Sequence, residues 1–429
     1  MNRENGHSRL PSSPMAEPTK SETGFRPTES ADETPTPPRD AGERVHFPGL
    51  NGLRFVAAFS VLLYHVEAFK SIAMMPNWIS LGFWRSLGPY GVVCFFTLSG
   101  FLITYLLLEE QNRTGTIRVR KFYLRRILRI WPLYYLIVVL GFLALPHAAA
   151  ILIHPQAGLP DDLLSKLPLF VFFLPNLAWI VYGIIPFAGP LWSVGVEEQF
   201  YLTWPLLLRV LGKRVLVGII LVIVIMVSLR FALPPIAASL SSGPMDARNW
   251  QIAIGFLWTL KLECMAMGAL AAYGLHRNCT RTLAVFYHPV SQVAALALIG
   301  VSLTFEVRYR QFDNLVWGAF FAVLILNLAS NPKSLIKLRG RALDYLGRIS
   351  FGIYVYHSFV IALLLLVFKN LIPTEGLVFN GILYSLATCL TILIAGLSHR
   401  YYESPFLRLK TRYMVIQSSG ESPLPKPRD

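Results

Sequence analysis

Arg54 and His65 are the first two residues whose types and spacing could support chemistry. They lie eleven positions apart in the apolar stretch LNGLRFVAAFSVLLYHV, which is close to three helical turns, so their side chains share one helix face. The rise between them is about 16 Å, which predicts Arg54 near one edge of a bilayer and His65 near its middle. A neutral imidazole there could take a proton from an alcohol. The alternative is a histidine hydrogen-bonded to a neighbouring helix, with Arg54 reaching the headgroups.

A second group of candidates is the arginine cluster in RKFYLRRILRIWPLYYL. Arg126 and Arg129 are one helical turn apart and point the same way. Paired guanidinium groups match the oxygens of a phosphate, so these two residues are candidates for a phosphate clamp. Ordinary anchoring of a membrane span on its cytoplasmic side explains them equally well.

Two adjacent carboxylates, Glu197 and Glu198, follow in GPLWSVGVEEQFYLTWP. Carboxylates inside an apolar span are costly and usually functional, and we place this pair just inside the outer boundary of its span. Neighbouring residues of a helix face different directions, so they cannot both line one surface. We expect one to face a cavity and the other to pair with a basic residue such as Lys261 or Arg54. A purely structural role for both is the alternative.

Weaker signals come from two later segments. Lys261 and Glu263 are two positions apart, so they do not share a helix face. Tyr354 and His357 do share one, and they fit a buried hydrogen-bond network as well as a functional site. We expect neither a disulfide nor a metal site, because no CxxC spacing joins the four cysteines, which are Cys94, Cys264, Cys279 and Cys389.

The elements that position these residues must be membrane helices. Hydrophobic residues make up 54% of the chain and charged residues only 15%, which is more apolar surface than one soluble core could bury. In a bilayer, helices satisfy the backbone without water. The net charge of +15 does not indicate a nucleic-acid partner, because the basic residues lie in short runs between apolar spans.

Apolar runs of helix length predict an all-α integral membrane protein, a polytopic bundle of about ten transmembrane helices. The expected spans lie near residues 51–70, 88–108, 128–146, 190–208, 214–233, 254–275, 289–305, 313–330, 349–369 and 377–399. Residues 1–45 lack an apolar run, which predicts a disordered tail. Residues 46–410 would form the transmembrane domain, and residues 411–429 a second tail.

The basic residues predict the orientation of these spans. The loop after the second span is the most basic, and every second connection after it is also the richer in Lys and Arg. Cytoplasmic loops carry that excess, so we expect both termini in the cytoplasm and the protein in the cell (inner) membrane. Residues 167–182 are also apolar, but an eleventh crossing there would reverse this bias. Pro168 and Pro175 favour an interfacial or re-entrant segment on the outer face.

At these motifs the sequence resembles the acyltransferase-3 family, membrane-bound acyltransferases of polysaccharides, macrolides and other glycans. The resemblance covers about residues 46–410. It rests on six stretches in the family's order, PGLNGLRFVAAFSVLLYH, FFTLSGFLIT, FYLRRILRIWPLYY, LWSVGVEEQFYLTWPLL, LGRISFGIYVYHS and SHRYYESPF. We expect no esterase-like domain after the last span, which would make the chain similar to the family's stand-alone form.

The resemblance assigns roles to the candidate residues. The basic residue and histidine of the family's first helix fall on Arg54 and His65, its R-x-x-R element falls on Arg126 and Arg129, and its paired glutamates fall on Glu197 and Glu198. Three positions depart from the family pattern and could alter the acceptor pocket. These are Asn51, where aspartate is frequent, Gly195, where serine is frequent, and Val93, where an acidic or polar residue is frequent.

The resulting hypothesis is an O-acyltransferase that moves an acyl group, with acetyl expected, from cytoplasmic acyl-CoA to a hydroxyl of a carbohydrate or glycoconjugate. His65 would be the general base, with Glu197 or Glu198 orienting the imidazole or the acceptor. Arg126 and Arg129, helped by Arg54, would hold the CoA phosphates. Acyl-CoA is a co-substrate here, and no bound cofactor or metal is expected. The alternative is a proton-coupled transporter or flippase of a glycan or acyl compound, which the same buried charges permit but which internal repeats would favour.

Overall fold

The computed structural model describes residues 45, 47–152, 163–183, 187–241, 243–369 and 376–416. All of them belong to the unit Glu43–Asp429. The predicted N-terminal tail lies outside the described residues except for Val45, as does the predicted C-terminal tail beyond residue 416.

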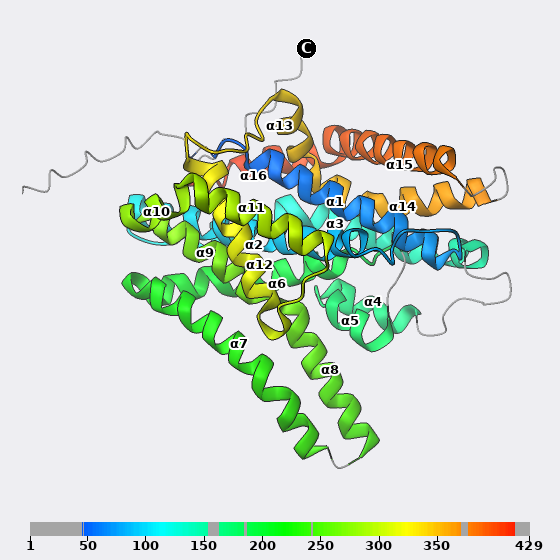
Figure 1. Ribbon diagram of the computed structural model, residues 1–429, viewed down its shortest axis with the longest axis horizontal. Coiled ribbons are helices and arrows are strands. Elements are labelled where there is room, and N and C mark those ends of the chain that lie inside the picture. The colour runs from blue at the N-terminus through cyan, green and yellow to red at the C-terminus, as the bar shows by residue number, and fades with distance from the viewer. Residues whose placement is uncertain are drawn as a thin grey trace, which may run out of the picture. The chain divides into compact units, whose positions relative to one another are not determined.

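The described residues form helices joined by turns, without a β-strand (Figure 1). The α-helices are α1 (Leu50–Ile72), α2 (Gly82–Thr114), α3 (Val119–Leu152), α4 (Leu163–Val171), α5 (Pro175–Tyr182), α6 (Leu191–Leu211), α7 (Val215–Leu240), α8 (Pro244–Leu260), α9 (Leu262–His276), α10 (Thr280–Tyr287), α11 (Pro289–Thr304), α12 (Asp313–Ser330), α13 (Arg341–Arg348), α14 (Ser350–Lys369), α15 (Leu377–Leu397) and α16 (Ser404–Thr411).

Among the described residues, eight stretches are long and apolar enough to cross a membrane, or nine if α10 and α11, bent by 59°, count as one span. The prediction of an all-helical, multi-pass membrane protein is confirmed. The count is lower than the expected ten partly because α6 and α7 form one candidate stretch of 50 residues, Leu191–Leu240. A straight helix of that size would be about 75 Å long, more than twice the ~30 Å of a hydrocarbon core. The stretch breaks after α6 at Gly212, where φ is 54°.

Residues 167–182 form the two short helices α4 and α5 instead of one span. The chain turns between them at Phe173, a non-glycine residue with a φ of 58°. Its carbonyl oxygen accepts a hydrogen bond from Gln199 Nε2 at 2.9 Å, and the Tyr134 hydroxyl donates to the Phe170 carbonyl at 2.8 Å. Irregular backbone at membrane depth requires such protein partners. The segment is therefore not one continuous helix, and its placement as an interfacial or re-entrant segment on the outer face stays a prediction.

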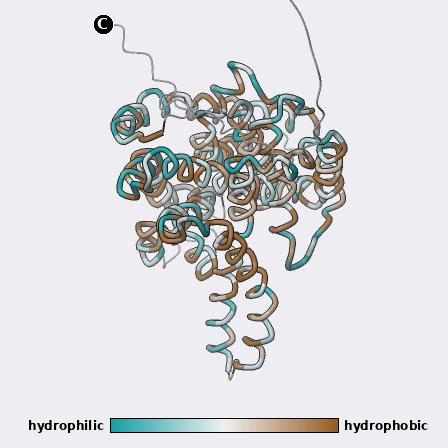
Figure 2. Tube along the Cα trace, turned by 90° about the vertical axis from the view of Figure 1, so that its left-hand side faces the viewer, coloured by the Kyte–Doolittle hydropathy of each residue, from teal (hydrophilic) through white to brown (hydrophobic). Residues whose placement is uncertain are grey.

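Helix α2 lies inside the bundle, with 78% of its apolar window buried. It packs most extensively against α9 and α1. By contrast, only 28% of the Leu191–Leu240 window is buried, and the connected ends of α7 and α8 project beyond the other helices (Figure 1). Hydrophobic residues follow much of that helix pair (Figure 2), as expected for a lipid-facing surface.

Two glycines permit the close approach of α2 and α9. A Cβ atom on Gly100 would overlap the Met265 carbonyl oxygen, and one on Gly268 would overlap the Thr97 carbonyl oxygen. Both obstacles are backbone atoms, which cannot rotate away. Small residues at helix interfaces in membranes allow this kind of backbone contact.

We therefore expect Gly268→Ala to lower the thermal unfolding temperature in nanodiscs, since overpacking of this kind costs about 1–3 kcal/mol or more. Gly274→Ala is the matched control in the same helix, because a Cβ there meets no atom within 4 Å. The control should unfold at or slightly above the wild-type temperature, because alanine favours helix over glycine. Equal unfolding temperatures for the two variants would contradict this account of the interface.

Candidate active site

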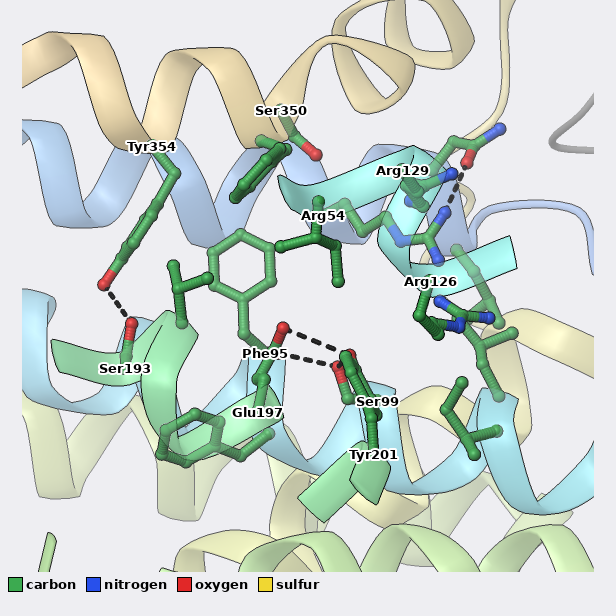
Figure 3. A pocket seen from close by; sticks show the side chains of 18 of the residues that line it. Arg54, Phe95, Ser99, Arg126, Arg129, Ser193, Glu197, Tyr201, Ser350 and Tyr354 are labelled. Atoms are coloured by element: carbon green, nitrogen blue, oxygen red, sulfur yellow. Dashed lines mark hydrogen bonds between the residues drawn. The ribbon is translucent and has the colours of Figure 1, made fainter. Parts of the chain in front are cut away.

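A cavity of about 160 Å³ lies between α1, α2, α3, α6 and α14. Arg54, Arg126, Arg129 and Glu197 all line it (Figure 3), and we call it the arginine cavity. The sequence predicted the glutamates near one membrane boundary and the arginines near the other. The structure instead places Glu197 and all three arginines around one space.

The arginines reach this cavity from the first turns of two helices. Helix α2 ends at Thr114 because Gly115 adopts a φ of 74° and donates its N–H to the Gln111 carbonyl, which is a common helix stop. The chain then reverses into α3, whose first turns carry Arg126 and Arg129. Their one-turn spacing puts both on the cavity side.

Each guanidinium has a different environment. Arg126 lies over the rings of Phe122 and Tyr201, at 5.4 and 5.3 Å from the ring centroids. Arg54 Nη1 donates to Asn51 Oδ1 at 3.3 Å. Within the described part of the chain, Arg129 has no hydrogen-bond or ion-pair partner. Three cations around one carboxylate make the cavity suited to an anionic ligand.

Glu197 is held on the cavity wall by two hydroxyl donors. Its Oε1 accepts from Ser99 Oγ at 2.7 Å and its Oε2 accepts from the Tyr201 hydroxyl at 3.1 Å, as Figure 3 shows. These bonds satisfy both carboxylate oxygens, which fixes the side chain in place. Glu197 is thus the member of the pair that faces a cavity.

Glu198 faces another direction, toward α3. Its Oε2 accepts from the Trp131 indole N–H at 3.2 Å, so its donor is an indole and not Lys261. Its Oε1 is buried and has no hydrogen-bond partner among the described residues. A buried oxygen without a partner needs a water or a ligand atom, which keeps Glu198 a candidate although it lines neither of the two cavities described in this section.

His65 lines a second and larger cavity of about 660 Å³, which we call the histidine cavity. Its wall combines residues of α1, α2 and α14 with residues of α4 and α5, the start of α6 and the end of α8. Most of the lining is aromatic or aliphatic, including Tyr64, Phe69, Phe170, Trp179, Trp192 and Trp258. A mostly apolar cavity with a few polar groups is typical of a small-molecule site.

The hydrogen bond of His65 defines which ring nitrogen can act as a base. Nδ1 lies 2.8 Å from the Val61 carbonyl oxygen. A carbonyl only accepts, so Nδ1 carries the proton and Nε2 of the neutral ring keeps its lone pair. The ring of His357 lies 4.7 Å away, centroid to centroid, and is itself fully buried. His357 therefore packs beside His65. The sequence alone did not decide whether His357 belongs to a functional site or to a buried hydrogen-bond network.

The two cavities share a wall made by Val92 and Tyr354, which line both. The Tyr354 hydroxyl lies 2.6 Å from Ser193 Oγ and 3.2 Å from the Pro190 carbonyl oxygen. These bonds hold the Tyr354 ring between the two cavities. The centroids of the Tyr354 and His357 rings lie 5.9 Å apart, in an edge-to-face arrangement. One tyrosine and one valine thus lie between the cationic cavity and the imidazole.

The structure brings together part of the predicted site. Arg54 and His65 share a helix face as predicted, but the rise along α1 leads them into different cavities. Sequence reasoning did not single out Ser99, Tyr201 or Val92. For Ser99, a hydroxyl inside the apolar run FFTLSGFLIT was a usable signal. No sequence signal pointed to Val92, because its role comes only from its position between the two cavities.

Comparison with known proteins adds an independent line of evidence. The model of the acyltransferase-3 family, described as an acyltransferase domain, matches residues 47–400. The chain is 26% identical to the Staphylococcus aureus (strain MRSA252) protein named "Putative O-acetyltransferase SAR0937" over 399 residues, 87% of this chain and 59% of that protein. It is 28% identical to O-acetyltransferase OatA of Staphylococcus aureus (strain NCTC 8325 / PS 47) over 386 residues, 84% of this chain and 57% of that protein. The chain thus spans under three-fifths of the length of these relatives. No solved structure matches.

We expect Tyr201→Phe to destabilise the protein, because it removes one of the two donors to a carboxylate in the bundle interior. The loss should be about 1–3 kcal/mol, measured as a lower unfolding temperature in nanodiscs. Phenylalanine keeps the ring under Arg126, so the effect isolates the hydroxyl. Tyr401→Phe is the control, since Tyr401 is 67% exposed and should unfold like wild type. An unchanged unfolding temperature for Tyr201→Phe would show that the hydroxyl does not support Glu197.

Proposed function

Because the chain belongs to the acyltransferase-3 family, we propose that it is an O-acyltransferase that transfers an acyl group from acyl-CoA to a hydroxyl of a carbohydrate or glycoconjugate. The observation that carries this proposal is the shared wall between a cationic cavity and a cavity that contains an available imidazole nitrogen. Acetyl is the proposed acyl group, because the relatives are named O-acetyltransferases. Family membership supports the enzyme over the transporter.

The arginine cavity is the proposed donor site. At about 160 Å³ it is too small for a whole CoA molecule, so only the acylated end of the pantetheine arm would enter. Arg126 and Arg129, with Arg54, would hold the phosphates at its mouth, as paired guanidinium groups do. The basic loop before α3 favours the cytoplasmic side for this mouth, where acyl-CoA is available, with both termini on that side.

The histidine cavity is the proposed acceptor site. His65 Nε2 would take the proton of the acceptor hydroxyl while its oxygen attacks the thioester carbon. As the new C–O bond forms, the C–S bond breaks and the CoA thiolate leaves, to be protonated by the imidazolium. The Val61 carbonyl orients the ring in this scheme, in place of the glutamate expected from sequence. Glu197 would act on the donor side, next to the arginines.

Transfer requires the thioester and the hydroxyl to meet at the shared wall. Tyr354 would have to leave Ser193 for the acyl end to pass Val92. Direct transfer needs no serine or cysteine nucleophile. The acyl group would then move parallel to α1, from the level of Arg54 to the level of His65.

The first test removes the base. We expect His65→Ala to lower kcat for acceptor-stimulated CoA release from acetyl-CoA by about 10²- to 10⁴-fold, measured with purified protein in nanodiscs. Binding of CoA should be unchanged, since His65 lies outside the donor cavity. His288→Asn is the control, because asparagine can still cap α11, where the imidazole accepts from the Val290 N–H. Full activity of a folded His65→Ala protein would refute the proposed base.

The second test concerns the phosphate clamp. Arg129→Met should raise the Kd for CoA about tenfold or more, the value of one charge-assisted hydrogen bond. Arg129 has no partner in the described structure, so its loss should leave the fold intact. Added salt should weaken CoA binding more in wild type than in the variant. Arg209→Met, at the exposed end of α6, is the control, and equal Kd values for both variants would place the CoA phosphates elsewhere.

A further inference from the structure

Lys261 occupies an unusual backbone position beside the histidine cavity. It lies between α8 and α9 with φ 45° and ψ 34°, a left-handed conformation that non-glycine residues rarely adopt. The helix of the predicted span over residues 254–275 is interrupted at this lysine, although Pro244–His276 is one candidate membrane span. Strained backbone of this kind often occurs at functional sites. Lys261 lines the histidine cavity together with His65, Trp258 and Thr259.

A buried polar network fixes the ammonium group. Lys261 Nζ donates to Asn314 Oδ1 at 3.0 Å, and Asn314 Nδ2 donates to Glu263 Oε1 at 3.0 Å. The second bond determines the orientation of the amide, so its oxygen faces the lysine. Glu263 also accepts from Arg230 at 2.6 Å. Asn314 of α12 thus holds Nζ directly, and Glu263 of α9 and Arg230 of α7 support Asn314.

Within these four hydrogen-bonded residues, two cations share one carboxylate. Arg230 and Glu263 form a close ion pair, which leaves the charge of Lys261 without a bonded carboxylate among the described residues. The neighbouring carboxylate of Asp313 accepts from the Tyr90 hydroxyl and lies near Lys261 without contacting its ammonium group. An ammonium has three N–H donors, and Asn314 is the one hydrogen-bond acceptor that the described residues provide. A cation at this depth is costly without a counter-ion, so a ligand anion would complete the site.

We propose that Lys261 binds an anionic group of the acceptor, a carboxylate or a phosphate, in the histidine cavity. This inference rests on the proposed function, because it names the chemical class of the acceptor at that same site. The aromatic lining would pack against the rest of the ligand, and the ion pair with Lys261 would set its orientation. A few placed polar groups in an apolar cavity determine ligand orientation in this way. Lys261 would thereby hold the acceptor hydroxyl toward His65.

The test compares three ligands that share a hexose ring. Methyl glucoside is neutral, methyl glucuronide carries a carboxylate, and glucose 1-phosphate carries a phosphate. Binding is measured by tryptophan fluorescence in nanodiscs of uncharged phosphatidylcholine, since Trp179, Trp192 and Trp258 line the cavity. We expect wild type to bind at least one anionic ligand about tenfold more tightly than the neutral one. The ligand with the larger preference identifies the anion as carboxylate or phosphate.

Three variants make the test specific. Lys261→Met should abolish the anion preference while leaving methyl glucoside binding unchanged, and Lys261→Arg should keep the preference. Arg248→Met removes an exposed cation of α8 and should behave like wild type. Equal binding of the three ligands by wild type, no binding of any of them, or an anion preference that survives in Lys261→Met would each overturn the proposal.

CoA release in the same samples separates this proposal from the proposed function. A Lys261-dependent anion preference without acceptor-stimulated CoA release would support the anion site and count against acyl transfer to such acceptors. Release that the neutral and anionic sugars stimulate equally, in wild type and Lys261→Met alike, would support the acyltransferase and refute the role of Lys261.

Discussion

Polar groups inside a bilayer must find their partners within the protein, because the hydrocarbon core offers no water. The described helices meet this constraint with compact networks. Glu67 and Lys70 on α1, both almost fully buried, pair at 2.8 Å, and the Tyr384 hydroxyl and Asn380 of α15 complete their bonding. This network joins the first and the last long helices of the bundle. Polar residues thus connect helices that are far apart in the sequence.

The same constraint explains where the backbone departs from helix. Broken helices would be unstable against lipid, but α4, α5 and the α8–α9 break all contribute residues to the lining of the histidine cavity. Asn176 of α5 donates to Thr259 of α8 at 3.0 Å, so the two irregular segments also support each other. Non-helical backbone is tolerated at membrane depth where it lines a cavity. The breaks create the space that the proposed acceptor would fill.

Groups with incomplete partners mark the places where chemistry would occur. Arg129 in the arginine cavity, Nε2 of His65 and the ammonium of Lys261 each have bonding capacity that the described residues leave unused. Fully hydrogen-bonded side chains, such as those of Glu197 and Tyr354, lie between these groups and form walls of the two cavities. An enzyme that transfers a group from a charged substrate to a second substrate needs both kinds of side chain. Fixed side chains form walls that position the substrates, and polar groups with unused hydrogen-bonding capacity contact them.

Hydrophobic composition and run length alone determined that this is an all-helical, multi-pass membrane protein, because only helices of that length satisfy the backbone in lipid. Motifs in order determined its family, and helical spacing correctly placed Arg54 and His65 on one face. Tertiary structure decided which partners those residues meet, because contacts between helices depend on packing that sequence spacing does not encode. It put Glu197 with the arginines, His65 with His357 and Tyr354 between two cavities. It also turned the Lys261 segment from the middle of a predicted span into a break, since Asn314 of a distant helix supplies the bond that holds it.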